Sequence, residues 1–359
     1  MIARPLLSFF SDSDPASFQA LISRPQIKDI LLEMGAELRI GIDDFSEERA
    51  ENIQMLNEAG VPVYAWIRAP KAQSFTFRID NASSLLKRYQ SFKNWSDSHG
   101  LQWAGIGIDL RPPPEELQKW AEQPMLSAWN AYLNLFEQEQ LEFALPLFQE
   151  FKSAVHKDGY VLESYVLPFS MDENPAEAKA LQYMGQILNV ETDRIIPLCH
   201  TNSPYVYPAS ILDYGARAHR VGLGTTSNES FQGLMTQEAL DWESLSRDLR
   251  LAHDVCQEIH ISSLESIAAN GWLEALADFD FSVPVFLYSK ELEDQENQAF
   301  VSQQAFKILS YPILSTAALI ILTILSILFS FFFIRFLFSW KKKNATSQQE
   351  EIDYEIISG

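Results

Sequence analysis

The chain of 359 residues is strongly acidic and rich in apolar residues. It carries a formal net charge of −21, is 47% hydrophobic and 12% aromatic, and contains only 14 glycines and 17 prolines. This composition excludes disordered and fibrous classes, and one large folded domain of about 300 residues is expected. No nucleic-acid partner is expected, because phosphate binding draws on clustered Lys and Arg and the sequence has no basic stripe. The two cysteines, Cys199 and Cys256, form no CxxC pair and are expected to be buried free thiols.

Short apolar runs alternate with longer stretches of helical character. Residues 46–60 illustrate a helix, since Ser46 and an acidic first turn open the stretch and Gly60 closes it. Eight strand-like runs alternate with such segments, which predicts parallel strands closed into a (β/α)8 TIM barrel. An open, doubly wound α/β sheet is the main alternative, but no GxGxxG loop supports it. The eight runs are residues 5–12, 38–44, 61–68, 103–111, 160–169, 194–202, 219–227 and 257–265.

A long uncharged run lies near the end of the sequence, from Pro312 to Ile334. At about 1.5 Å per residue it is long enough to cross a hydrocarbon core of about 30 Å, so it is predicted to be a single transmembrane helix in contact with the lipid bilayer. The sequence thus divides into a barrel domain (1–288), a charged juxtamembrane stalk (289–311), the transmembrane helix (312–334) and a basic-flanked polar tail (335–359).

The side of the membrane on which the barrel lies is left open by the sequence. Lys307 precedes the apolar run, whereas Arg335 and the lysines 341–343 follow it, which favours a cytoplasmic tail and an external barrel. The first 15 residues, however, lack the features of a signal peptide, which favours a cytoplasmic barrel.

Residue parity along the strands predicts which side chains face the barrel axis. In the fourth run, Ile106 and Ile108 are expected to face the helices, so that the glycines and charges between them face inward. An uncompensated buried charge costs several kcal/mol, so these groups must pair with each other, contact water or bind a ligand. We therefore expect a bare, polar hollow; the alternative is an internal ion-pair network. Expected inward positions are Ser8, Phe10, Asp12, Arg39, Gly41, Asp43, Gly105, Gly107, Asp109, Arg111, Arg220, Gly222, Gly224, Glu258, His260 and Ser262.

Several polar residues fall at the carboxyl ends of the predicted strands, the rim where active sites of TIM barrels lie. Tyr165 shares a face with Glu163, and Tyr205 lies in a loop where its ring could stack on a sugar. The expected ligand-binding residues are Asp12, Asp43, Arg111, Tyr165, His200, Tyr205 and Glu265.

The segment "GIGIDLRP" resembles the fourth-strand signature of family 18 chitinase-like glycosidases, DGxDxDxE. Asp109 matches the last aspartate of that pattern, whereas Ala104 and Gly107 replace the first two. Arg111 stands where the family has its catalytic glutamate. The resemblance implies a glycosidase-like TIM barrel that acts on a carbohydrate.

Glycoside hydrolysis generally needs two carboxyl groups across the scissile bond. Asp109 and Glu163 are the predicted catalytic pair, because Glu163 is the only charge in an apolar strand, where burial favours the protonated form. The alternative for Glu163 is a buried ion pair with Arg39, Arg111 or Arg220. No HxH or HExxH motif occurs, so neither a metal nor another cofactor is expected.

Two functions remain in view from the sequence. The first is a membrane-anchored, glycosidase-like hydrolase that acts on a glycan, which the isolated Glu163 favours. The second is a non-catalytic barrel that binds carbohydrate or a protein partner at the membrane, which Arg111 in place of glutamate favours.

Overall fold

A computed structural model describes most of the chain, in two compact units that comprise Met1–Lys307 and Ile308–Gly359. Each unit is considered by itself. The described residues are 4–70, 75–112, 114–123, 126, 130, 133–134, 138–173, 181–182, 187, 190–203, 206–224, 239–311, 316–317, 320–333 and 335.

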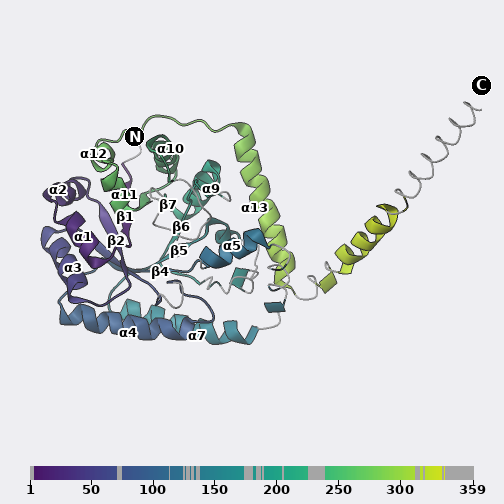
Figure 1. Ribbon diagram of the computed structural model, residues 1–359, viewed down its shortest axis with the longest axis horizontal. Helices are drawn as coiled ribbons and strands as arrows, with labels where there is room; N and C mark the ends of the chain where they lie inside the picture. The colour runs from purple at the N-terminus through teal and green to yellow at the C-terminus, as the bar shows by residue number, and fades with distance from the viewer. Residues whose placement is uncertain are drawn as a thin grey trace, which may run out of the picture. The chain divides into compact units, whose positions relative to one another are not determined.

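Eight parallel strands form the centre of the first unit (Figure 1). Their order in the sheet is β6-β5-β4-β3-β2-β1-β8-β7, and a parallel bridge between Leu198 and Gly222 joins the two outermost strands. The sheet is therefore a nearly closed barrel, which confirms the predicted eight-stranded TIM-like architecture. The strands are β1 (Leu6–Ser11), β2 (Glu37–Ile42), β3 (Val63–Ile67), β4 (Gly105–Asp109), β5 (Leu162–Val166), β6 (Arg194–Pro197), β7 (Arg220–Leu223) and β8 (Glu258–Ser262).

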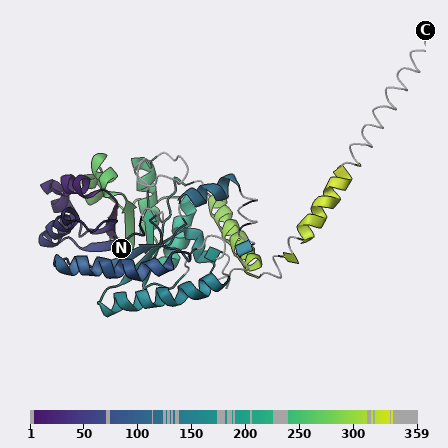
Figure 2. The same cartoon turned by 60° about the horizontal axis from the view of Figure 1, so that its bottom comes forward.

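Helices surround this sheet, and two of them, α4 and α7, lie side by side along one flank (Figures 1 and 2). The helices are α1 (Pro15–Ile22), α2 (Pro25–Glu33), α3 (Glu47–Ala59), α4 (Ala82–Ser98), α5 (Pro114–Glu122), α7 (Gln138–Lys157), the 3-10 helix η2 (Pro168–Asp172), α9 (Pro208–Ala218), α10 (Trp242–His253), α11 (Leu264–Ala269), α12 (Leu273–Ala277) and α13 (Ser289–Ser310).

The helix boundaries follow from capping residues that the sequence displays. Ser46 caps α3, because its side chain accepts a hydrogen bond from the backbone N–H of Arg49, and Glu47 and Glu48 occupy the first turn. Gly60 ends α3 in the left-handed conformation, with φ of 80°. This helix begins and ends where the sequence predicted.

The main apolar core lies between the strands and the surrounding helices. Ile40, Ile42, Ile106 and Ile108 are fully buried in it, as the parity of the strands predicted. Cys199 and Cys256 are buried free thiols, also as expected. The opposite face of each strand is thereby directed toward the barrel axis.

The predicted stalk is helical over Ser289–Ser310. Gln295 of α13 is buried and accepts a 2.7 Å hydrogen bond from the hydroxyl of Ser210 at the start of α9. In the second unit, residues 320–333 are helical. Within the described residues, no helix combines the length and the apolar character needed to cross a membrane. Residues 312–315, 318–319 and 334 of the predicted span, and 336–359 of the tail, lie outside the described part, so the transmembrane helix stays a prediction.

Candidate functional site

An aromatic layer fills the middle of the barrel. Phe10, Trp66 and Tyr165 pack edge to face with centroid separations of 4.9 to 5.7 Å, and Ile196 and Leu198 complete the layer. Edge-to-face packing of this kind is the favoured geometry for aromatic rings.

The inward glycines make room for these and neighbouring side chains. A Cβ atom built on Gly107 would lie 2.1 Å from the hydroxyl oxygen of Tyr165, and one on Gly105 would lie 2.6 Å from the ring of Tyr64. A Cβ atom on Gly222 would lie 2.3 Å from Cδ2 of Leu198. The expectation of a bare, wet hollow along this face was therefore wrong, because the space left by each glycine is taken by a side chain of an adjacent strand. Polar groups that could meet a ligand lie beyond this layer, at the carboxyl ends of the strands.

Glu163 lies in this sealed interior. Its two carboxylate oxygens accept hydrogen bonds from Nε and Nη2 of Arg39 at 3.1 and 3.2 Å, and both side chains are fully buried. The hydroxyl of Tyr165 donates a further bond of 2.6 Å to Glu163. Burial raises the pKa of Tyr165, so its hydroxyl keeps the proton that it donates. Glu163 thus occupies the buried ion pair that the sequence left open as its alternative role, and Tyr165, expected to bind a ligand, is fully buried inside the barrel.

Further ion pairs lie toward the amino ends of the strands. Glu258 of β8 contacts Arg220 at 3.1 Å and Arg194 at 3.5 Å. His260 shares a 2.6 Å hydrogen bond between its Nδ1 and the hydroxyl of Ser8. Both partners are buried, so this end of the barrel is held by polar contacts within the chain.

At the carboxyl end of β4, Asp109 and Arg111 form a closed pair. Asp109 accepts hydrogen bonds from Nε and Nη2 of Arg111 at 2.9 and 2.5 Å, and from its backbone N–H at 3.0 Å. Both residues are buried. His200 is buried nearby; its burial, aided by the charge of Arg111, lowers its pKa to about 3, so it is neutral near pH 7. A carboxylate with a bidentate partner is poorly placed to transfer protons.

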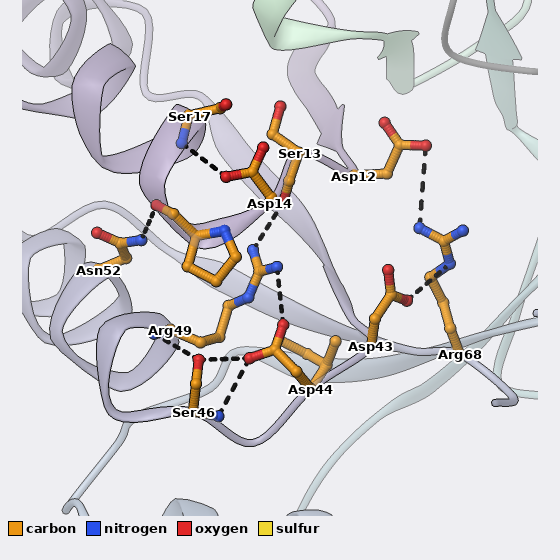
Figure 3. Close-up of polar contacts among 12 residues, drawn as sticks. Asp12, Ser13, Asp14, Ser17, Asp43, Asp44, Ser46, Arg49, Asn52 and Arg68 are labelled. Carbon is orange, nitrogen blue, oxygen red and sulfur yellow. Dashed lines mark hydrogen bonds and ion pairs between the residues drawn. The ribbon is translucent and has the colours of Figure 1, made fainter. Parts of the chain in front are cut away.

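A second cluster of polar side chains surrounds Arg68, the residue that directly follows β3 (Figure 3). Its Nε lies 3.1 Å from Oδ1 of Asp43, and its Nη1 lies 3.9 Å from Oδ2 of Asp12. The two carboxylates directly follow β2 and β1, at the rim predicted for them. The side chains of Asp12 and Asp43 are 30% and 32% exposed, so both can be reached from solvent. We call Asp12, Asp43, Arg68 and Glu265 the mouth cluster.

Arg68 was not singled out from the sequence, although it ends the third strand-like run. Its guanidinium stacks on the ring of Phe75 at 4.1 Å and lies 5.0 Å from the ring centroid of Trp66. A Cβ on Gly41 would lie 3.2 Å from its Cδ and Nη1. Gly41 therefore provides the room in which Arg68 reaches both aspartates.

Glu265, at the start of α11, is oriented by two hydroxyl groups, one on the last residue of β1 and one just after it. Its Oε1 accepts hydrogen bonds from Ser11 and, at 2.7 Å, from Ser13. Its Oε2 is buried without a hydrogen-bond partner among the described residues. The alternative reading of Glu265, as a first-turn acid of the next helix, also holds, since it is the first-turn acid of α11.

The loops that carry these residues are fixed by a network behind the cluster (Figure 3). Arg49 donates to the backbone carbonyl of Ser13 at 3.0 Å and to Asp44 at 3.2 Å. Asn52 donates to the carbonyl of Pro15 at 2.7 Å. The segment after β1 is thus tied to α3, which holds the backbone that follows Asp12 in place.

The carboxylates of the mouth cluster influence each other. Burial raises the pKa of Asp12 to about 6; Arg68 opposes this shift, whereas the negative charges of Glu265 and Asp43 add to it. Burial also raises the pKa of Asp43, against the effect of Arg68. A carboxyl group that titrates near pH 6 can both donate and accept a proton near neutral pH.

The remaining predictions concern Tyr205 and metal binding. Tyr205 lies outside the described residues. In the part of the chain that the structure describes, no group of three or more His, Cys, Asp or Glu side chains could hold a metal ion.

Comparisons with known proteins give no family for this chain. No family model and no curated protein matches it. Among solved structures, a GH18 chitinase from Pseudoalteromonas aurantia is 12% identical with a TM-score of 0.48, and the match covers 77% of this chain and 100% of the chitinase chain. A xylose isomerase-like TIM barrel/4-hydroxyphenylpyruvate dioxygenase fusion protein is 12% identical with a TM-score of 0.40, covering 86% of this chain and 44% of the fusion. The assignment of a TIM-like barrel rests on the strand topology described above.

Proposed function

We propose that the protein is a glycosidase-like hydrolase that acts on a glycan at the barrel mouth, with Asp12 as its acid–base group. The observation that carries this proposal is the position of Asp12. It is a partly exposed carboxyl group with a pKa near 6 at the carboxyl end of β1, and it shares the guanidinium of Arg68 with a second carboxyl group, Asp43.

The chemistry follows from this arrangement. In glycoside hydrolysis a protonated carboxyl group gives its proton to the leaving oxygen, and a second carboxylate acts as nucleophile or activates water. Asp12 is suited to the first role, because about half of its population is protonated near pH 6. Asp43 is suited to the second, because burial raises its pKa but the guanidinium of Arg68, 3.1 Å away, opposes this shift and favours the ionised form.

This proposal moves the reaction away from Asp109 and Glu163, the pair predicted from the sequence. Each of them is buried and held by an arginine with two hydrogen bonds. Their geometry favours structural roles, and the fourth-strand resemblance then reflects the architecture of the barrel rather than its chemistry.

The test is turnover of defined oligosaccharides, measured as new reducing ends. The panel contains oligomers of chitin, of the peptidoglycan backbone and of glucans. Asp12→Asn should lower turnover at least 100-fold, the usual scale for loss of a general acid, and Asp43→Asn should also lower it. Asp29→Asn, on the exposed face of α2, is the matched control and should leave turnover unchanged. Full activity of a folded Asp12→Asn protein would contradict the assignment.

The second candidate function is a barrel that binds carbohydrate, or a protein partner at the membrane, without catalysis. The closed Asp109–Arg111 pair favours it, because it occupies the rim position where the resembled signature has a catalytic acid. Calorimetric binding of an oligosaccharide that the protein never cleaves would support this function against the first.

We further propose that residues 312–334 anchor the protein in a membrane. The support is the uncharged run itself, flanked by Tyr311 and Arg335. Separation of cell membranes, followed by an alkaline wash, should leave the full-length protein in the membrane fraction and release a chain that ends at residue 311. Protease treatment of intact cells then reports the side, since only an external barrel is degraded.

A further inference from the structure

Negative charge exceeds positive charge around Asp12. Asp12 interacts with one cation, Arg68, and with two other carboxylates, Asp43 and Glu265. Two neighbouring arginines, Arg49 and Arg88, also act on Asp43, but their hydrogen bonds go to other groups: Arg49 bonds to Asp44 and to a backbone carbonyl, and Arg88 donates to the backbone carbonyls of residues 42 and 43. The mouth cluster is therefore favourable for a ligand that brings a positive charge.

Glu265 has a buried acceptor atom within this cluster that no described residue satisfies. Both of the hydroxyl donors that reach its carboxylate, from Ser11 and Ser13, bond to Oε1. Its Oε2 is buried and has no partner in the described part of the chain. Leaving a buried acceptor unsatisfied costs about 1–3 kcal/mol, more when it is charged, so a donor from a ligand would be stabilised here.

Trp66 provides a buried donor in the layer below. The side chain is only 5% exposed, and its Nε1 has no acceptor among the described residues. The guanidinium of Arg68, which contacts Asp12 and Asp43, lies over the same indole ring. Within the described residues, the mouth and the layer below it thus combine a buried anionic acceptor and a buried neutral donor that both lack a hydrogen-bond partner.

This combination discriminates between kinds of ligand. A metal ion would use the carboxylates but not the indole N–H, and no described group of side chains has the arrangement for a metal. A neutral sugar would use the N–H but would leave the charge excess in place. An amino sugar supplies both complements, since its ammonium group has three donors and its hydroxyl oxygens accept hydrogen bonds.

We propose that the glycan bound at the barrel mouth carries a free, non-acetylated amino group, which is held by Oε2 of Glu265 beside Asp12 and Asp43. This inference rests on the proposed function, because it names the substrate class of the same site. Binding of the ammonium offsets the negative charge of Glu265, which helps to raise the pKa of Asp12. Asp12 should then release a proton when the ligand binds near pH 6.

The experiment uses the full-length protein and compares glucosamine oligomers with N-acetylglucosamine oligomers of equal length, by titration calorimetry at pH 6 in two buffers of different ionisation enthalpy. We expect the amino form to bind at least tenfold more tightly, to lose affinity with added salt, and to release protons on binding. Equal affinity for the two forms, or tighter binding of the acetylated form, would overturn the proposal.

Variants locate the effect. Glu265→Gln should remove the preference for the amine, whereas Glu274→Gln, on an exposed position of α12, should keep it. If Glu265→Gln does not fold, Asp43→Asn provides the second test and should reduce the preference several-fold. Tight binding of Mg²⁺ or Ca²⁺ that competes with the amine would instead indicate a metal site and would overturn the proposal.

These experiments distinguish a failure of this inference from a failure of the proposed function. Selective binding of the amino oligomers without any cleavage supports this inference and contradicts the hydrolase. Cleavage of acetylated or neutral glycans with no preference for the amine supports the hydrolase and contradicts this inference.

Discussion

In the middle of the barrel, the guanidinium of Arg39 donates two hydrogen bonds, of 3.1 and 3.2 Å, to the carboxylate of Glu163, and neither side chain is exposed. Removing one member of such a pair leaves a buried charge without compensation. We predict that Arg39→Met lowers the free energy of unfolding by about 3–5 kcal/mol, measured by urea denaturation.

The double variant Arg39→Met with Glu163→Leu should recover part of this loss, because it removes both fully buried charges, although Glu37 loses the 2.6 Å bond that it accepts from Nη1 of Arg39. As a control, Lys93→Met breaks the exposed Lys93–Asp97 pair of α4 and should cost less than about 1 kcal/mol. If Glu163→Gln folds and loses turnover with unchanged stability, Glu163 has a catalytic role and the structural assignment is wrong.

Gly107 provides the space for the ring of Tyr165, and this gives a second prediction. The Cβ of Gly107→Ala would overlap the Tyr165 hydroxyl, which is itself bonded to Glu163. The ring must shift and the bond to Glu163 must break, so we expect a loss of about 3 kcal/mol or more in the free energy of unfolding.

Gly41→Ala serves as the comparison, since its Cβ would meet the flexible side chain of Arg68 at 3.2 Å. It should cost clearly less stability but weaken the contacts of Arg68 with Asp12 and Asp43. Equal losses in the free energy of unfolding for Gly107→Ala and Gly41→Ala would show that the packing of Tyr165 on Gly107 contributes no more to stability than the contact of Arg68 with Gly41.

The outward residues of the barrel could be predicted from the sequence, whereas the contents of its interior could not. Alternation alone places Ile106 and Ile108 on the helix side, because it depends only on the geometry of one strand. What fills the space beside Gly107 depends on the register between two strands, in which Asp109 is paired with Tyr165. The sequence of one chain does not reveal that register, so it predicted an empty hollow beside the inward glycines.

The candidate site was partly predictable for a similar reason. Asp12, Asp43 and Glu265 follow strands, and the rule that barrel sites lie at carboxyl ends places them at the mouth. Arg68 follows a strand as well, but its role depends on the space beside Gly41 and on the rings of Trp66 and Phe75. The two side-chain hydrogen bonds between Asp109 and Arg111 could not be inferred from parity, which only places both residues on one side of the strand.

The histidines should titrate very differently, which gives a third prediction. Burial and the charge of Arg111 lower the pKa of His200 to about 3, whereas a backbone hydrogen bond and Glu47 raise the pKa of His99 above its ordinary value. In NMR spectra of the imidazole protons between pH 4.5 and 8, His99 should titrate and His200 should not. A midpoint for His200 above pH 5.5 would contradict its burial beside Arg111.

The pH dependence of stability gives the last prediction, through Asp12. Its pKa is about 6 in the folded protein and about 3.8 when the chain is unfolded, so the folded state binds the proton more tightly. The ionised carboxylate therefore destabilises the fold above pH 6, and this cost is relieved as the pH falls from about 6 to about 4.

Asp12→Asn should raise the free energy of unfolding at pH 7.5 by about 1–2 kcal/mol, less than the full two-unit shift implies because the side chain is partly exposed. At pH 4 the variant and the wild type should be equally stable, as measured by urea denaturation at both pH values. A variant that is less stable than the wild type at pH 7.5 would mean that the contact of Asp12 with Arg68 outweighs its desolvation, and the raised pKa on which the proposed acid–base role depends would then be wrong.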